Sequence, residues 1–228
     1  GMVDDATGYI RLQQFTENSS NETRKAFDSL KAAHPGMKGL VLDLRGNPGG
    51  LLEEAVKIAN IFVDAGKTIV STKGRVQAWN RTYKTTAYAD NDSVRLAILI
   101  NRMSASASEI VAGAIQDLDR GVIIGQRSFG KGLVQTTHNL PYNARLKLTT
   151  AKYYTPSGRC IQAIDYSHRD EDGSVAYIPD SLRKSFKTAD GRKVLDGGGI
   201  EPDVKIAPGY LSGIAVSLLS KNYICNYA

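Results

Sequence analysis

A glycine-rich loop between an apolar strand and a helix limits the fold of this chain more than any other feature. Residues 38–44 form a short apolar run that is typical of a buried strand, and the loop at 45–50 has the sequence Arg-Gly-Asn-Pro-Gly-Gly. A helix is predicted over residues 51–62, and Gly66 suits its C-terminal end. A strand that leads through a loop into a helix is the unit from which α/β cores are built.

Two further strand-then-helix units repeat this pattern. Residues 9–15 alternate and precede a helix that begins with the capping box Ser19-x-x-Glu22, and the strand at 95–100 precedes a helix that begins near Ser106. Three such units predict an α/β core. Further strands are predicted at 68–72, 82–86 and 122–125, and a hairpin at 133–140 and 146–154, so we expect antiparallel hairpins attached to the core.

The length of 228 residues is ample for a hydrophobic core. We expect one compact domain over residues 1–228, with a long polar loop at about 165–193 and a last helix at 212–220. No apolar run approaches the ~18–20 residues that span a bilayer.

Charge and metal-ligand patterns exclude several classes of function. The net charge is +6, but the basic residues are scattered and form no basic tail, so nucleic-acid binding is not expected. Neither the cysteines nor the histidines have the spacing of metal ligands, so we expect no metal, no cofactor and two free thiols. These residues are Cys160, Cys225, His34, His138 and His168.

Three serines stand where the strand at 95–100 gives way to the next helix. The segment Ser104-Ala105-Ser106-Ala107-Ser108-Glu109 permits a tight turn there. A serine at this junction faces unpaired N–H groups and the positive end of the helix dipole, which would stabilise the oxyanion formed when a hydroxyl attacks a carbonyl. Ser106-x-x-Glu109 is also a capping box, so Ser106 could act only as a helix cap.

Lys131 follows in a loop with glycine on both sides. Gly130 and Gly132 let the backbone approach closely, so the ammonium group could be desolvated. A neutral lysine amine can take the proton of a serine hydroxyl. Gln135 falls on the strand face of Leu133 and could orient the amine. The alternatives are a surface lysine in a turn and an exposed glutamine.

The glycine loop at 45–50 offers backbone N–H groups after a buried strand. Its spacing matches neither the dinucleotide fingerprint nor the phosphate-binding P-loop. We therefore interpret it as a donor to an oxyanion, and phosphate binding is the alternative.

Five segments together resemble the carboxy-terminal processing (tail-specific) proteases, over roughly residues 8 to 206. Their order and spacing are specific, although each alone is weak. The segments are 41–50, 104–109 with Gln116-Asp117, 129–132 with Gln135, 153–159, and 198–203.

The resemblance implies that Ser106 is the nucleophile, that Lys131 is the general base and that Gln135 orients the lysine. It also implies that the oxyanion is held by the backbone N–H of Ala107 and by one from the turn at Gly49 and Gly50. Asp117 matches a family position too. We interpret it as structural, because it lies about three helical turns from Ser106.

The family has a ClpP/crotonase-like α/β core and a peptide-binding PDZ domain, which we expect in the full-length protein ahead of this segment. Its members cleave protein substrates that are bound through their C-terminal region. They act in the bacterial periplasm or cell envelope, or in the chloroplast lumen. The resemblance leaves homo-oligomerisation open.

Three alternatives remain. The first is a catalytically silent peptide- or ligand-binding module on the same fold. The second is a Ser–His hydrolase with His138 as base, although a regular strand places His138 on the face opposite Gln135. The third is a crotonase-like acyl-CoA enzyme, which would leave Ser106 and Lys131 unexplained.

Overall fold

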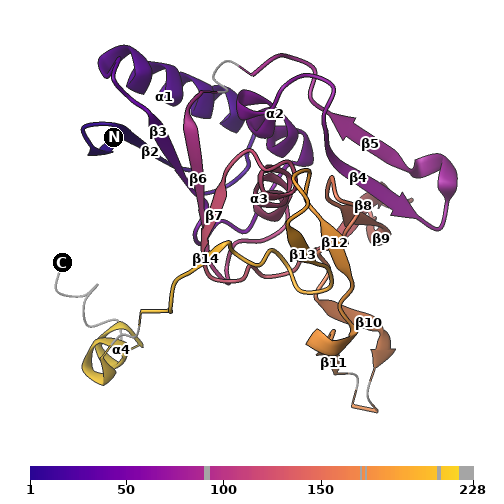
Figure 1. Ribbon diagram of the computed structural model, residues 1–228. Helices are drawn as coiled ribbons and strands as arrows, with labels where there is room; N and C mark the ends of the chain where they lie inside the picture. The colour runs from indigo at the N-terminus through magenta and orange to yellow at the C-terminus, as the bar shows by residue number, and fades with distance from the viewer. Residues whose placement is uncertain (90–92, 170, 173, 210–211, 221–228) are drawn as a thin grey trace.

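A six-stranded sheet forms the centre of the computed structural model, which describes residues 1–89, 93–169, 171–172, 174–209 and 212–220. The strand order is β1-β2-β3-β6-β7-β14, and all neighbours are parallel except β1 and β2 (Figure 1). The strands are β1 (Met2–Asp4), β2 (Thr7–Arg11), β3 (Gly39–Asp43), β6 (Arg95–Ile100), β7 (Val122–Gly125) and β14 (Val204–Lys205). The α/β core that the sequence predicts is confirmed.

Helices α2 (Leu52–Phe62) and α3 (Ala107–Asp117) lie between this sheet and a second one, and α1 (Ser19–Ala33) packs against α2 and β2. Helix α3 is buried along its whole length. Its sequence, Ala-Ser-Glu-Ile-Val-Ala-Gly-Ala-Ile-Gln-Asp, has small side chains on the faces that must approach neighbouring elements closely. A helix enclosed on every side gives the residues at its N-terminus a fixed place.

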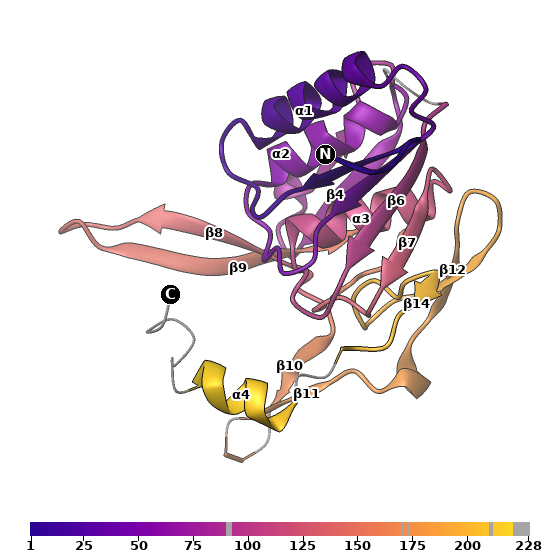
Figure 2. The ribbon, with the colours of Figure 1, turned by 90° about the vertical axis from the view of Figure 1, so that its left-hand side faces the viewer.

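The second sheet is antiparallel and has the order β5-β4-β9-β8. It contains β4 (Thr68–Gly74), β5 (Arg81–Lys84), β8 (Leu133–Asn139) and β9 (Arg145–Tyr154), and the 3-10 turn η1 (Gln77–Trp79) joins β4 to β5. The β8–β9 hairpin extends away from the body of the molecule (Figure 2). The predicted hairpin is therefore confirmed, and β8 is an outer strand of its sheet.

The segment predicted as a polar loop at 165–193 forms short paired strands instead. Strands β10 (Ile164–Arg169) and β11 (Val175–Tyr177) pair with each other, as do β12 (Ser185–Lys187) and β13 (Lys193–Leu195), with the turn η2 (Asp180–Leu182) between the two ribbons. The loop prediction missed these ribbons because strands of three to six residues are too short to give a periodic signal.

The predicted capping box at the start of α1 is also replaced. Asn18 is the N-cap residue, and Ser19 is already helical. The free N–H of Ser20 finds its acceptor on α2, where the Glu54 carboxylate accepts it at 2.8 Å. A long-range carboxylate thus takes the place of the local Glu22.

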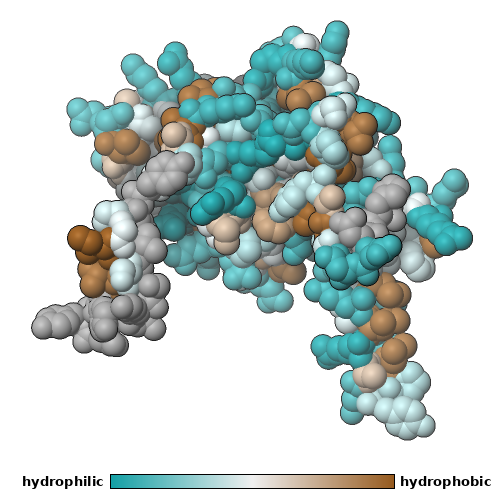
Figure 3. All heavy atoms as spheres, turned by 90° about the horizontal axis from the view of Figure 1, so that it is seen from below, coloured by the Kyte–Doolittle hydropathy of each residue, from teal (hydrophilic) through white to brown (hydrophobic). Residues whose placement is uncertain are grey.

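The C-terminal helix α4 (Gly213–Ser220) agrees with the predicted helix at 212–220 and stands apart from the core. Its Ile214 and Leu218 side chains are exposed, and Figure 3 shows hydrophobic atoms on several parts of the surface, including a group beside grey atoms at the left. Among the described residues, no helix is both long and apolar enough to cross a membrane. Cys160 is a free thiol, and Cys225 lies outside the described residues.

Candidate active site

Three neighbouring parallel strands bring the predicted site residues to one edge of the main sheet. β3 ends at the glycine loop, β6 at the turn that holds Ser106, and β7 at the loop that holds Lys131. β6 pairs with β3 on one side and with β7 on the other. The carboxyl ends of parallel strands are where α/β proteins place their binding sites.

The glycine loop is joined to the serine turn by two hydrogen bonds that the main chain of Asn47 accepts. Its carbonyl oxygen accepts the Ala105 N–H and the Ser108 hydroxyl, both at 3.0 Å. The Asn47 side chain is fully buried and donates to the Leu12 carbonyl at 2.8 Å. Asn47 therefore anchors the loop at both of its sides.

Gly49 is pressed against the turn that carries Ser106. A Cβ at Gly49 would lie 2.7 Å from the Ala105 oxygen and 2.8 Å from both the Ala107 nitrogen and the Ser106 Cβ. Gly49 also has a φ of +98°, a conformation that residues with a Cβ rarely adopt. Only glycine permits this contact between the loop and the candidate nucleophile.

The three serines of the turn have different surroundings. Ser104 and Ser108 are fully buried, and their hydroxyls donate to the backbone carbonyls of Leu44 and Asn47. Ser106 is half-buried and is the N-cap residue of α3, with φ 57° and ψ −113°. A non-glycine residue in such a region costs about 1–3 kcal/mol and is typical of functional sites. Of the three serines of this turn, Ser106 alone is not fully buried, and its role as nucleophile stays a prediction.

Two backbone N–H groups beside Ser106 have no acceptor among the described residues: those of Ala107 and Gly50. The Gly49 N–H is already used, because it donates to the Asn47 side-chain oxygen at 2.8 Å. Of the predicted oxyanion donors, Ala107 and Gly50 therefore remain available in this conformation, and Gly49 does not.

The Glu109 carboxylate joins the serine turn to the lysine loop. Its Oε1 atom accepts the Ser128 hydroxyl and the Gly130 N–H, both at 2.6 Å. Its Oε2 atom accepts the N–H groups of Ser106 and Lys131, both at 2.8 Å. One oxygen thus holds the backbones of the two predicted catalytic residues within two hydrogen-bond lengths of each other.

Glu109 is fully buried, and its burial raises its pKa above the ordinary value of 4.5. The hydrogen bonds from Ser128, Lys131, Ser106 and Gly130 oppose that rise, because all four favour the charged form. From sequence, Glu109 was recognised only as the second half of a capping box. Nothing local indicates that a loop some twenty residues away would share the same carboxylate.

In the part of the chain that the structure describes, the lysine side chain forms no hydrogen bond or ion pair. Lys131 is exposed, so the predicted desolvation of its ammonium group was wrong for the chain alone: the loop lies at the open edge of the molecule. Among the described residues, no hydrogen bond joins Lys131 to the Ser106 hydroxyl or to Gln135. The structure brings the two backbones together but leaves the side chains to be aligned.

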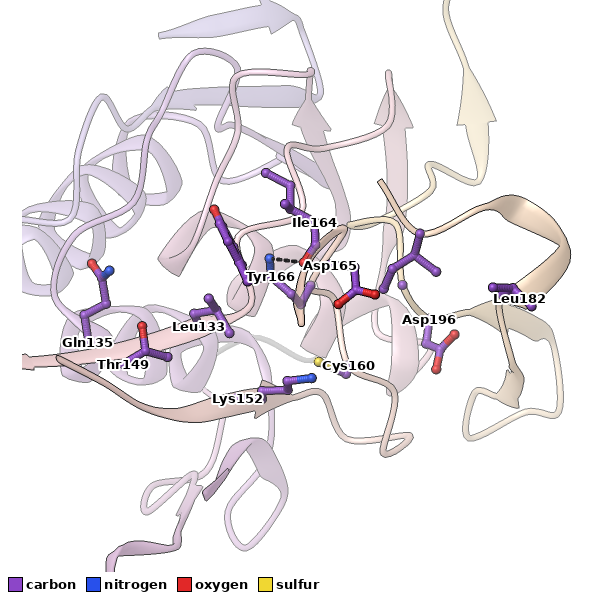
Figure 4. Close-up of a pocket in the computed structure, with 13 residues that line it drawn as sticks. Leu133, Gln135, Thr149, Lys152, Cys160, Ile164, Asp165, Tyr166, Leu182 and Asp196 are labelled. Atoms are coloured by element: carbon purple, nitrogen blue, oxygen red, sulfur yellow. Dashed lines mark hydrogen bonds between the residues drawn. The ribbon is translucent and has the colours of Figure 1, made fainter. Parts of the chain in front are cut away.

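Gln135 lies in a cavity of about 580 Å³ on one face of β8, together with Leu133 (Figure 4). His138 lines a different cavity, of about 290 Å³, with Val134 and Thr136. The prediction that Gln135 and His138 lie on opposite faces of the strand is confirmed. Since no hydrogen bond between the described residues links Gln135 to Lys131, its orienting role stays a prediction.

Asp117 has a partner that explains it without any role in a reaction. Its carboxylate forms an ion pair with Arg159 at 2.8 Å, and both side chains are completely buried. It also accepts the Ser157 N–H at 3.0 Å. The pair fastens the end of α3 to the segment at 153–159, so our structural interpretation of Asp117 fits. Within the described ranges, no group of three or more metal-ligand side chains lies close enough to hold an ion.

Comparison with known proteins places this geometry among peptidases. Residues 6–168 match peptidase family S41. The carboxy-terminal-processing protease of Bartonella bacilliformis is 48% identical over 164 residues, which cover 71% of this chain and 38% of that protein. A probable CtpA-like serine protease of Staphylococcus aureus is 44% identical over 159 residues, covering 68% of this chain and 31% of that protein.

Solved structures give the same picture. A photosystem II D1 C-terminal processing protease superposes with a TM-score of 0.67 and 32% identity, covering 89% of this chain and 42% of that one. A lipoprotein from Streptococcus agalactiae, at 18% identity and a TM-score of 0.56, shares the fold. The chain spans roughly a third of the length of the curated relatives described above.

Proposed function

This chain belongs to peptidase family S41, and from that premise we propose that it is the catalytic part of a serine endopeptidase of the carboxy-terminal processing type, with Ser106 as nucleophile and Lys131 as general base. The observation that carries the proposal is the carboxylate of Glu109, which holds both backbones with one oxygen. A helix cap alone would not require the same carboxylate oxygen to hold the backbone of Lys131 as well.

In the proposed reaction the Ser106 hydroxyl attacks the carbonyl carbon of the scissile bond while the neutral Lys131 amine takes its proton. The Ala107 and Gly50 N–H groups hold the oxyanion. The lysine then gives the proton to the departing amine as the C–N bond breaks, which leaves an ester on Ser106. A water molecule, deprotonated by the same lysine, hydrolyses that ester and regenerates the hydroxyl.

The substrate is proposed to be a protein chain that binds as an added strand through its C-terminal region. β8 is an outer strand, and it begins two residues after Lys131. A strand that pairs with its free side would pass Lys131 and exclude water from the ammonium group. Such covering would supply the desolvation that the chain alone does not, and it would bring Gln135 near the lysine.

The relatives extend well beyond the matched region. We propose that the full-length protein carries a PDZ domain that delivers the substrate's C-terminus, and that it works outside the cytoplasm, in the periplasm or cell envelope. Both statements rest on the resemblance to carboxy-terminal processing proteases.

Proteolysis of casein tests the proposal. The parent chain should cleave it, and Ser106→Ala and Lys131→Ala should each lose about 10³-fold or more in rate. Matched controls are Ser185→Ala and Lys147→Ala, at exposed positions of other strands, which should cleave like the parent.

The alternative is a catalytically silent module. If the parent and all variants are inert, the same assay is repeated on a chain extended by the region that precedes residue 1. Cleavage that appears only then, and depends on Ser106 and Lys131, supports the proposal. Continued silence, or cleavage that survives both substitutions, contradicts it.

A further inference from the structure

We infer that Gln162 is a positioning residue for Lys131, an inference that rests on the proposed role of the lysine. Gln162 follows the segment at 153–159 and is not among the catalytic residues predicted from the sequence. Its side chain is buried, and its Oε1 atom accepts the Gly132 N–H at 2.8 Å. The backbone next to Lys131 is therefore fixed by an amide from a different part of the chain.

The amide has one defined orientation. Its NH₂ group donates to the Ile164 carbonyl oxygen at 3.0 Å, the bond drawn as a dashed line in Figure 4. Because that oxygen can only accept, the nitrogen must face Ile164 and the oxygen must face Gly132. Glutamine alone among side chains of this length offers an acceptor and a donor together.

The two glycines beside Lys131 pack directly on the same segment. A Cβ at Gly132 would lie 2.5 Å from the backbone nitrogen of Gln162, and a Cβ at Gly130 would lie 2.3 Å from the Ala163 Cβ. The Ala163 N–H also donates to the Gly130 carbonyl at 3.0 Å. These contacts explain why glycine stands on both sides of the lysine: the loop needs close approach to residues 162–163.

Glu109 and Gln162 thus hold the lysine loop from two sides. Glu109 fixes the N–H groups of Gly130 and Lys131, and Gln162 fixes that of Gly132. A lysine side chain is long and flexible, so the position of its amine depends on where its Cα is held. A displacement of about 1 Å in a reacting group costs about 10²-fold in rate.

Gln162 also lines the cavity of about 580 Å³ that contains Gln135 and Lys152. Its amide therefore forms part of the boundary between that cavity and the lysine loop. A substitution that removes the amide should therefore affect the Gly132 N–H first among the groups of the proposed site.

The first test is amide hydrogen exchange at Gly132, which needs no turnover and so decides the matter even if this chain alone is inactive. Gln162→Met, which keeps the size and removes both polar groups, should make exchange at Gly132 about tenfold faster. Gln162→Glu keeps the acceptor, so exchange at Gly132 should be faster than in the parent and slower than in Gln162→Met. Gln116→Met is the matched control: it removes a buried glutamine whose partners are Arg159 and residues 201 and 203, so Gly132 should not change.

The second test is the pH dependence of casein cleavage at saturating casein, where the rate reports on the complex with substrate. In that complex the substrate covers Lys131, and a lysine that is no longer held in place is covered less completely, so Gln162→Met should move the half-maximal rate to higher pH and lower the plateau about 10–100-fold. Mere destabilisation, as in Gln116→Met, lowers the rate equally at every pH. Unchanged exchange at Gly132, or an unchanged pH midpoint in Gln162→Met, overturns the inference. Full activity of Lys131→Ala would instead contradict the proposed function, and this inference with it.

Discussion

Replacement of Glu109 by leucine removes the acceptor that the backbones of Ser106 and Lys131 share. Four donors lose their partner at once, but they are not equally affected. Lys131 is exposed, so water can replace the carboxylate there, and the Ser128 hydroxyl keeps the bond it accepts from the Ile200 N–H at 2.6 Å. The Gly130 N–H is in a buried residue and that of Ser106 in a half-buried one.

The expected loss of stability follows from those two groups. A buried donor without an acceptor costs about 1–3 kcal/mol, so Glu109→Leu should lower the free energy of unfolding by about 2–6 kcal/mol, less what is regained because a buried charge is gone. Glu109→Gln keeps one carbonyl oxygen. With that oxygen in the place of Oε2, only the Gly130 N–H faces the new NH₂ group, and the loss should be about 1–3 kcal/mol.

The cleavage rate per folded molecule should depend on whether the side chain at position 109 still accepts both the Ser106 and the Lys131 N–H, and not on the stability of the variant. Glu109→Gln can retain the bridge between Ser106 and Lys131, so cleavage per folded molecule should fall about tenfold or less. Glu109→Leu frees both backbones, and a shift of about 1 Å should cost about 10²-fold.

The assay combines urea unfolding, followed by far-UV circular dichroism, with initial rates of casein cleavage corrected for the folded fraction. The reasoning is refuted if Glu109→Leu cleaves like the parent once that correction is made. It is also refuted if the glutamine and leucine variants lose the same activity per folded molecule.

Three further predictions follow from the same contacts. Gly49→Ala should lower the cleavage rate about 10²-fold, because a Cβ at this position would push Ser106 away. Gly46→Ala is the control: it also has a positive φ but no atom within 4 Å of the new Cβ, so it should change only the stability. Equal cleavage rates in the two variants would contradict this. Cleavage should fall as acid protonates Glu109, at a pH above the ordinary carboxyl pKa of 4.5, because the pKa of Glu109 is raised in the folded chain. The same protonation should not unfold the chain, since a raised pKa stabilises the fold fully below pH 4.5 and that stabilisation is lost as pH rises through the folded pKa. Glu109→Gln should lack this acid limb, and a parent pH profile identical to that of the variant would count against it. Arg159→Met leaves the Asp117 charge buried without its partner and should lower the free energy of unfolding by about 3–5 kcal/mol in urea; a change of about 1 kcal/mol or less would argue against a buried ion pair.

The core strands and the order of the site could be predicted from sequence because each depends on local pattern. The strands at 95–100 and 122–125 have the predicted bounds, since both are apolar runs that end at turn signals. The three strand-then-helix units predict the α/β core. Lys131 follows a fourth strand, β7, whose parallel pairing with β6 brings the loops of Ser106 and Lys131 to one edge of the sheet, and that pairing was not predicted.

Long-range polar contacts could not be predicted in the same way. The Ser106–Glu109 capping box is present as expected, but the second use of Glu109 depends on how the loop at 128–131 folds over α3. Gln162 is a similar case, since its acceptor role depends on Gly132, far along the chain. The exposure of Lys131 depends on what covers the loop, and no local sequence signal contains that information.

Covalent labelling of the nucleophile tests the central claim most directly. The chain would be treated with a fluorophosphonate, which phosphonylates activated serines, and the adduct located by mass spectrometry of peptides. The account predicts one adduct, on Ser106, that forms much more slowly in Lys131→Ala and does not form on the buried Ser104 or Ser108. An adduct on another serine, or labelling of Ser106 at the same rate without Lys131, would contradict it.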